Sequence, residues 1–97
     1  MNTQIQAIHF QAKDKLVELI EEKMHKLDTF HDGIVKKEIF LRLETGNAKA
    51  NKIVEVKVAL SGGSVFAKEK AANFEKAVFK VVEALRKQLR RHKNKRA

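Results

Sequence analysis

The last quarter of the chain, NFEKAVFKVVEALRKQLRRHKNKR (residues 73–96), decides the fold. At 100° per residue its apolar side chains fall within one arc, which is the pattern of an amphipathic helix packed against a sheet. This apolar stripe consists of Phe74, Ala77, Val78, Val81, Val82, Leu85 and Leu89. The helix would be roughly 35 Å long at about 1.5 Å per residue. Because the stripe ends at Leu89 while basic residues continue, we expect the final turns to project into solvent.

The other side of this predicted helix is strongly basic. From residue 73 onward there are nine Lys or Arg and two Glu, a net charge of +7, whereas the preceding residues carry only +2 of the total of +9. A basic face on a rigid element predicts an acidic partner, which could be nucleic acid, an acidic protein or a membrane surface. The alternative is a solvated tail that keeps the protein soluble.

Composition narrows the protein class. With 97 residues and 43% hydrophobic content, we expect one domain spanning residues 1–97. The chain has no cysteine, which excludes disulfides, a thiol nucleophile and thiolate metal ligands. The N-terminal residues lack the basic and apolar regions of a signal peptide, and no apolar run reaches the length of a membrane span. We therefore expect a cytoplasmic protein with no membrane partner.

Hydrophobic periodicity predicts six elements and an α+β fold. Strand and helix patterns occur in the order β-α-β-β-β-α: Thr3–Phe10, Lys13–Leu27, Val35–Leu43, Ile53–Leu60, Val65–Ala71 and Asn73–Arg96. Thr45–Lys52 is predicted to be a polar loop, and the glycines of Ser61–Ser64 predict a tight hairpin turn. The crossover helix makes the first two strands parallel, and the hairpins make the rest antiparallel. Each strand has one apolar face, so both helices should cover one side of a four-stranded mixed sheet, as in double-stranded-RNA-binding domains.

Alternation along the strands assigns side chains to the two faces of the sheet. The second strand should direct Val35, Ile39, Leu41 and Leu43 toward the core. Phe40 and Phe66 should then lie on the uncovered face, where aromatic rings can stack unpaired bases or make a protein contact. We favour a plain hydrophobic patch with Ile8 and Ile53, because no glycine-flanked aromatic motif is present.

Motifs for chemistry are lacking. His25, Asp28, His31 and Asp32 are close in sequence, but their spacing matches no metal motif. There is no phosphate-binding glycine loop, nucleophile elbow or convincing acid–base pair. Glu38 and Glu55 are better explained as strand residues that pair with Lys57 and Arg42. We expect no enzymatic activity, metal, cofactor or small-molecule substrate.

Two segments resemble a known family. LSGGSVFAKEKAANFEKAVFKVVEALRKQLRRHKNK (residues 60–95) resembles the ribosome hibernation promoting factor and protein Y family of translation inhibitors, also described as sigma-54 modulation proteins. That family has a glycine-containing hairpin, a short strand and a long helix that ends in a pattern like K-L-x-R-Q-L-x-K-x-K. EEKMHKLDTFHDGI (residues 21–34) resembles the end of its first helix. The chain departs from the pattern at Phe79, where the family has an acidic residue, and at Ala84, where it has lysine. Without the long form's C-terminal domain or protein Y's acidic tail, it resembles a short-form factor.

The resemblance implies a function without catalysis. It implies binding to rRNA in the decoding region of the small ribosomal subunit, where the protein would block mRNA and tRNA sterically. The side chains expected to contact phosphates are Lys23, Lys26, Lys76, Lys80, Lys87, Arg90, Arg91 and Lys93. A role in ribosome dimers together with a second factor stays open. The alternative function is a generic structured-RNA-binding or protein-interaction module.

Overall fold

The predicted order of elements and strand pairing is confirmed. The computed structural model describes residues 2–8, 11–44 and 51–96, with side chains for 3–8, 11–44 and 51–91. Its elements are β1 (Asn2–Ala7), α1 (Asp14–Phe30), β2 (Ile34–Leu43), β3 (Lys52–Leu60), β4 (Gly63–Ala71) and α2 (Phe74–Arg96). The sheet order is β1-β2-β3-β4, with β1 and β2 parallel and the other pairs antiparallel. Most of the predicted 45–52 loop, and Phe10 of the predicted first strand, lie outside the described residues.

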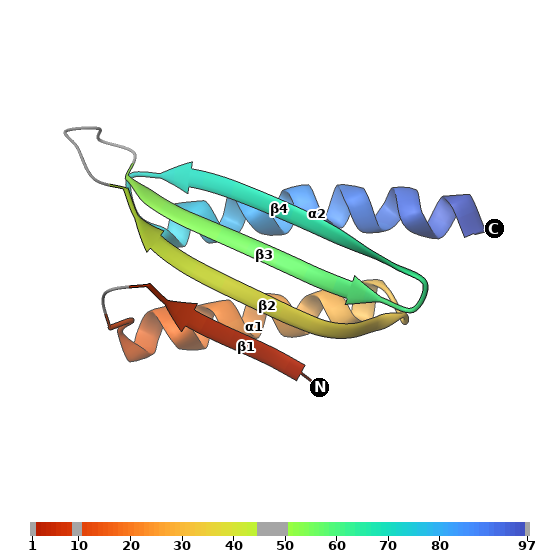
Figure 1. Ribbon diagram of the computed structural model, residues 1–97, viewed down its shortest axis with the longest axis horizontal. Coiled ribbons are helices and arrows are strands. Elements are labelled where there is room, and N and C mark those ends of the chain that lie inside the picture. The colour runs from red at the N-terminus through yellow and green to blue at the C-terminus, as the bar shows by residue number, and fades with distance from the viewer. Residues whose placement is uncertain (1, 9–10, 45–50, 97) are drawn as a thin grey trace.

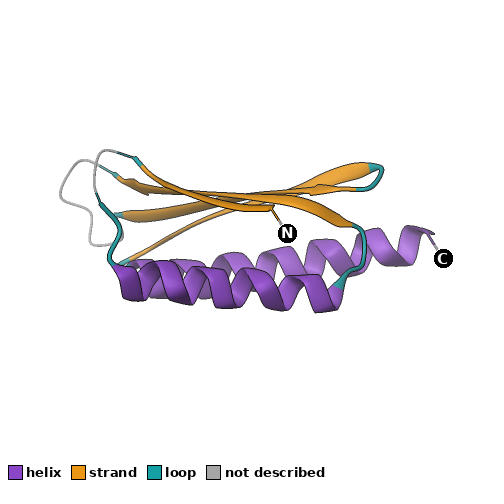
Figure 2. Ribbon diagram, turned by 90° about the horizontal axis from the view of Figure 1, so that it is seen from below, coloured by secondary structure: helices purple, strands orange, loops and turns teal. Residues whose placement is uncertain are grey.

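The helices form one layer and the sheet forms the other (Figure 2). Both helices begin at the same end of the sheet and run in the same direction, and α2 extends beyond the end of α1 (Figures 1 and 2). The core lies between the layers, where the α1 and α2 stripes meet the inward side chains of β2, β3 and β4. The structure confirms that both helices cover one face of the sheet. It also confirms that the last part of α2 extends beyond the packed layer (Figure 2). Among the described residues, neither helix combines the length and apolarity that a membrane span requires.

Helix α1 continues one turn beyond its predicted end at Leu27. The His31 N–H donates to the Leu27 carbonyl at 3.1 Å, so the helical bonding persists to Phe30. The chain then turns at Gly33, whose N–H donates to His31 Nδ1 at 3.0 Å. A Cβ atom at Gly33 would lie 3.0 Å from His31 Cε1, so this close approach favours glycine. A second glycine, Gly62, has a φ of 94° in the β3–β4 turn, a conformation that other residues rarely adopt.

A bulge near the start of β2 overturns part of the predicted inward face. The register with β3 shifts between Ile34 and Lys36, and the shift reverses the facing of the residues before it. Val35 is therefore 58% exposed, while Ile34 packs against the core. Leu43, also predicted to face the core, is 45% exposed because it pairs with Lys52 at the last rung of the sheet. Ile39 and Leu41 are buried as predicted.

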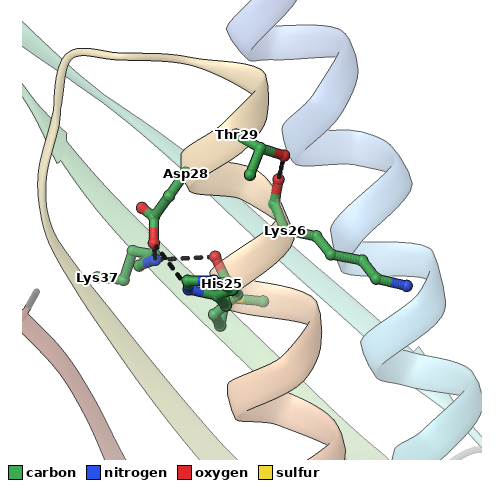
Figure 3. Close-up of polar contacts among 6 residues, drawn as sticks. His25, Lys26, Asp28, Thr29 and Lys37 are labelled. Carbon is green, nitrogen blue, oxygen red and sulfur yellow. Dashed lines mark hydrogen bonds and ion pairs between the residues drawn. The ribbon is translucent and has the colours of Figure 1, made fainter.

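Alternation with Ile39 and Leu41 places a lysine on the core face of β2. Lys37 is only 1% exposed, and its ammonium donates to Asp28 Oδ2 at 2.7 Å and to the Met24 carbonyl at 2.8 Å (Figure 3). The other carboxylate oxygen of Asp28 is buried and has no hydrogen-bond partner within the described part of the chain. A buried ammonium needs such partners, because an unpaired charge in the interior is costly. The contact thus ties the last turns of α1 to β2.

Helix α2 bonds to the β4 edge of the sheet. The Gln88 side-chain amide donates to the Phe66 carbonyl at 2.6 Å and accepts from the Phe66 N–H at 3.3 Å. Lys80 Nζ donates to the Lys70 carbonyl at 3.2 Å. These contacts occupy backbone groups of β4 that would otherwise be open to pairing with another strand. The helix itself is capped by Asn73, whose side-chain oxygen accepts from the Lys76 N–H at 2.8 Å.

We expect Leu85→Ala to destabilise the protein by about 2–5 kcal/mol, because Leu85 is fully buried in the core and its loss leaves a cavity. Thermal or denaturant unfolding measures the change. Leu43→Ala, the same substitution at a site that is 45% exposed, is the matched control and should cost less. Equal melting of the Leu85 variant and the wild type would contradict the packing of α2.

We expect Lys37→Met to lower the free energy of unfolding by about 3–5 kcal/mol, because it leaves the mostly buried Asp28 carboxylate without its charged partner. The double variant Lys37→Met/Asp28→Asn should regain much of this loss, since it removes the unpaired charge. The control is Lys36→Met, whose ammonium is 3.9 Å from Glu38 on the outer surface and should matter little. Equal denaturation midpoints for the two single variants would show that the buried pair is not structural.

Candidate nucleic-acid interface

The cations of α2 divide between two flanks of the helix. At 100° per residue, one group lies on the flank next to β4, and we call it the β4-side cluster: Lys76, Lys80, Lys87 and Arg91. Arg86 and Arg90 lie on the flank that faces α1. All six residues are exposed. Between the flanks stands Glu83, whose carboxylate accepts from Arg86 at 3.4 Å. The helix therefore presents basic side chains in two directions along its length.

The second flank meets basic side chains of α1 across a groove. This interhelical groove has a volume of about 420 Å³, and cations from both helices line it. Its lining consists of Lys23, Lys26, Leu27, Thr29, Phe30, Phe79, Val82, Glu83 and Arg86. Lys23 and Lys26 of α1 thus join the basic surface of α2.

Both aromatic rings in the interhelical groove lie under a cation. Lys23 Nζ is 5.1 Å from the centroid of the Phe79 ring, and the Arg86 guanidinium carbon is 5.6 Å from that of Phe30. These distances are typical of cation–π contacts. Among the described side chains, the one ion pair of Lys26 is with Glu22 at 3.8 Å, and both of these side chains are exposed. Since such surface pairs contribute little, the Lys26 ammonium can exchange Glu22 for another anion.

The β4-side cluster borders a shallower hollow. Lys80 and Lys87 line it together with Glu69, Phe79, Glu83 and Ala84. Ala84 is half-buried and packs against the core, so no cation stands between the two lysines on this flank. The Lys80 ammonium donates one of its three N–H groups to the β4 edge, which leaves two for a ligand.

The described structure places seven of the eight predicted phosphate contacts on the helical layer. Lys23 and Lys26 lie in the interhelical groove, and Lys76, Lys80, Lys87, Arg90 and Arg91 are exposed along α2. The eighth, Lys93, belongs to α2, but its side chain lies outside the described part. The predicted contacts did not include Arg86, Phe30 or Phe79. Phe79, Val82 and Arg86 are three and four residues apart, a spacing that puts them on one side of the helix, but only the packing of α1 shows what that side faces.

The opposite face of the sheet has a mixed charge. Arg42 Nε lies 2.9 Å from Glu55 Oε2, which confirms that predicted pair, and Lys70 Nζ lies 2.6 Å from Glu44 Oε2. Glu38 is the register partner of Lys57, but its ion pair is with Lys36. Carboxylates on this face thus offset several of its cations.

The two aromatic residues predicted on this face are there, but they do not form one platform. Phe66 is 50% exposed and lies opposite Lys57, whereas Phe40 is half-buried and lies opposite Glu55. The predicted neighbour Ile53 is buried. The two rings are on β2 and β4, with β3 between them, and they belong to different rungs of the sheet. Two adjacent bases therefore cannot stack on both rings, as they could if the rings lay on neighbouring strands.

His25, Asp28 and His31, near the end of α1, have structural contacts. His25 Nδ1 is 3.9 Å from Asp28 Oδ2, the same oxygen that accepts from the Lys37 ammonium (Figure 3). The Lys37 ammonium at Asp28 would repel a metal ion bound to the same carboxylate. His31 Nδ1 accepts from Gly33. Within the described ranges, no group of three or more His, Cys, Asp or Glu could hold a metal ion.

Comparison with known proteins gives a family match over nearly the whole chain. Residues 3–97 match the family described as Sigma 54 modulation protein / S30EA ribosomal protein. A ribosome hibernation promotion factor from Deinococcus radiodurans is 28% identical over 93 residues, which cover 95% of this chain and 49% of that protein. The chain thus spans about half the length of this curated relative.

Two solved structures are similar over almost their whole length. A ribosomal subunit interface protein from Coxiella burnetii has 26% identity and a TM-score of 0.82, and the match covers 97% of this chain and 99% of that one. The Protein Y N-terminal domain from Thermus thermophilus has 28% identity and a TM-score of 0.78, covering 95% and 99%. The resemblance drawn from residues 21–34 and 60–95 is thereby confirmed. Because the family match extends over residues 3–97 and the architecture is shared, this chain belongs to the Sigma 54 modulation protein / S30EA ribosomal protein family.

Proposed function

We propose that this protein is a ribosome-associated hibernation factor that binds rRNA in the decoding region of the small subunit and keeps mRNA and tRNA out. It would act in the cytoplasm and without catalysis. The family and the name of the Deinococcus relative support association with ribosomes in hibernation. The observation that carries the proposal is the convergence of basic side chains from both helices on one layer of the molecule.

Charge distribution favours this layer over the sheet as the RNA-binding surface. On the open sheet face, Arg42 and Lys70 are paired with carboxylates at 2.9 and 2.6 Å. On the helical layer, Lys87, Arg90 and Arg91 are exposed, and no ion pair of theirs is found among the described side chains. Such cations gain by neutralising phosphates and releasing counterions. Recognition of this kind depends on backbone shape rather than on base sequence, which suits folded rRNA.

The rigid geometry supports a steric mechanism. Helix α2 extends past α1, so its basic end can enter a channel that the thicker body of the protein cannot (Figure 2). The lysines would serve as point charges, and the arginines could bind phosphates with two parallel hydrogen bonds. A helix seated in the decoding channel occupies the volume that mRNA and tRNA require. Inhibition then follows from exclusion alone.

We expect Lys87→Ala and Arg91→Ala each to weaken binding to purified small subunits and to reduce the slope of log K against log salt concentration by about one unit. Each variant removes one phosphate contact, and both residues are exposed, so the melting temperature should not change. Lys57→Ala, an exposed lysine on the open sheet face, is the matched control and should leave the slope unchanged. Unchanged slopes in both α2 variants would show that the basic face is only a solvated surface.

We expect binding to compete with decoding-site ligands. Prebound mRNA and tRNA should raise the apparent Kd of the protein for small subunits, and the protein should raise theirs by the same factor, because coupling between two ligands is reciprocal. Replacing Lys80, Lys87 and Arg91 together by Glu should abolish inhibition of initiation and displacement of tRNA in parallel. Co-sedimentation and initiation assays measure these effects.

Two results would count against this mechanism. Simultaneous tight binding of the protein, mRNA and decoding-site tRNA to one subunit would exclude steric competition. Equal affinity for isolated RNA hairpins and for small subunits, with no effect of tRNA, would instead indicate a general module for structured RNA.

A further inference from the structure

The interhelical groove has a composition that phosphate binding alone does not require. Lys23, Lys26 and Arg86 supply three cations, and Glu83 supplies one carboxylate, among the described residues that line it. Phe79 is 48% exposed, although an apolar side chain of this size gains from burial. Its ring lies between the groove and the hollow of the β4-side cluster and lines both. The groove therefore combines a net positive rim with an accessible aromatic surface.

This combination fits one nucleotide better than other anionic ligands. A phosphate satisfies the cations, and a planar base can stack on a ring. An acidic peptide would pair with the cations but would not use the face of Phe79. The groove volume of about 420 Å³ falls within the usual range of ligand sites, about 300–1,000 Å³.

We propose that the interhelical groove receives one unpaired nucleotide of the bound RNA, with its base stacked on Phe79 and its phosphate held by Lys23, Lys26 and Arg86. This inference rests on the proposed function, since it takes RNA as the partner. It assigns to the groove a task different from that of the β4-side cluster, which would follow the phosphates of paired RNA. The protein then recognises a position where a base leaves the helix stack as well as a charged backbone.

The contact between Lys23 and Phe79 supports such an exchange. In the free protein, the Lys23 ammonium lies over the ring at 5.1 Å. When a phosphate enters, the flexible lysine can move onto it and uncover the ring for the base. Stacking of a base on an aromatic side chain contributes more than an exposed cation–π contact, so this replacement is favourable. Arg86 can keep its position over Phe30 at 5.6 Å and still donate to the phosphate, because a guanidinium has five N–H donors.

The test uses two RNA hairpins of equal charge. One carries a single bulged adenosine, and the other carries an abasic site at the same bulge, so only the base differs. The wild type should bind the bulged-adenosine hairpin at least about fivefold more tightly than the abasic one, the lower end of the range for one stacked base. Phe79→Leu should lose this preference and keep the affinity for the abasic hairpin.

Phe66→Leu is the matched control, because Phe66 is 50% exposed but lies on the open sheet face. It should retain the full preference for the base. Lys23→Gln should weaken binding to both hairpins equally while retaining the preference, which separates the phosphate contact from stacking. A preference that survives in Phe79→Leu, or that is lost in Phe66→Leu instead, would overturn the inference.

The same variants on purified small subunits distinguish this inference from the proposed function. Wild-type binding that competes with tRNA but is unaffected by Phe79→Leu would leave the function intact and reject the stacking site. A Phe79-dependent preference in the hairpin assay without binding to small subunits would support the stacking site and reject the proposed function. Weaker subunit binding by Phe79→Leu with normal binding by Phe66→Leu would support both.

Discussion

Burial of the α2 stripe against the sheet is the constraint on which the rest of the molecule depends. Leu85 and Leu89 are fully buried between the layers, so the orientation of α2 about its axis is determined by its apolar side chains. With one side of the helix committed to the core, the basic residues must point outward or to the flanks. The amphipathic pattern thus serves two purposes, because the interaction that stabilises the fold also displays the charge.

The lateral position of α2 is set by polar contacts at the sheet edge. Gln88 bonds to both backbone groups of Phe66, and Lys80 bonds to the Lys70 carbonyl. On the other side of the layer, the Lys37–Asp28 pair holds the end of α1 against β2. With both helices held, the groove between them keeps its shape, and Lys23 and Arg86 remain on opposite rims. A ligand therefore need not order these elements, which lowers the entropic cost of binding.

The two faces of the protein differ in what they offer to a polyanion. The sheet carries lysines and arginines, but carboxylates neutralise several of them, and its aromatic rings are separated by β3. Helix α2 has only two acids, Glu75 and Glu83, and the helical layer places its cations on a groove and along an extended rod. We infer that RNA binds to the helices. The separation of Phe40 and Phe66 by β3 does not support base stacking on the open sheet face.

The sequence by itself determined the order of elements, the strand pairing, the two-layer architecture and the basic character of α2. These properties follow from local periodicity and from short connections, which act along the chain. It did not determine the bulge that exposes Val35 and turns Ile34 toward the core, because a one-residue register shift depends on pairing with β3. Nor did it predict the groove around Phe79 and Arg86, since that site arises only where two helices distant in sequence pack side by side. Periodicity shows which residues share a face, and only the tertiary packing decides what that face meets.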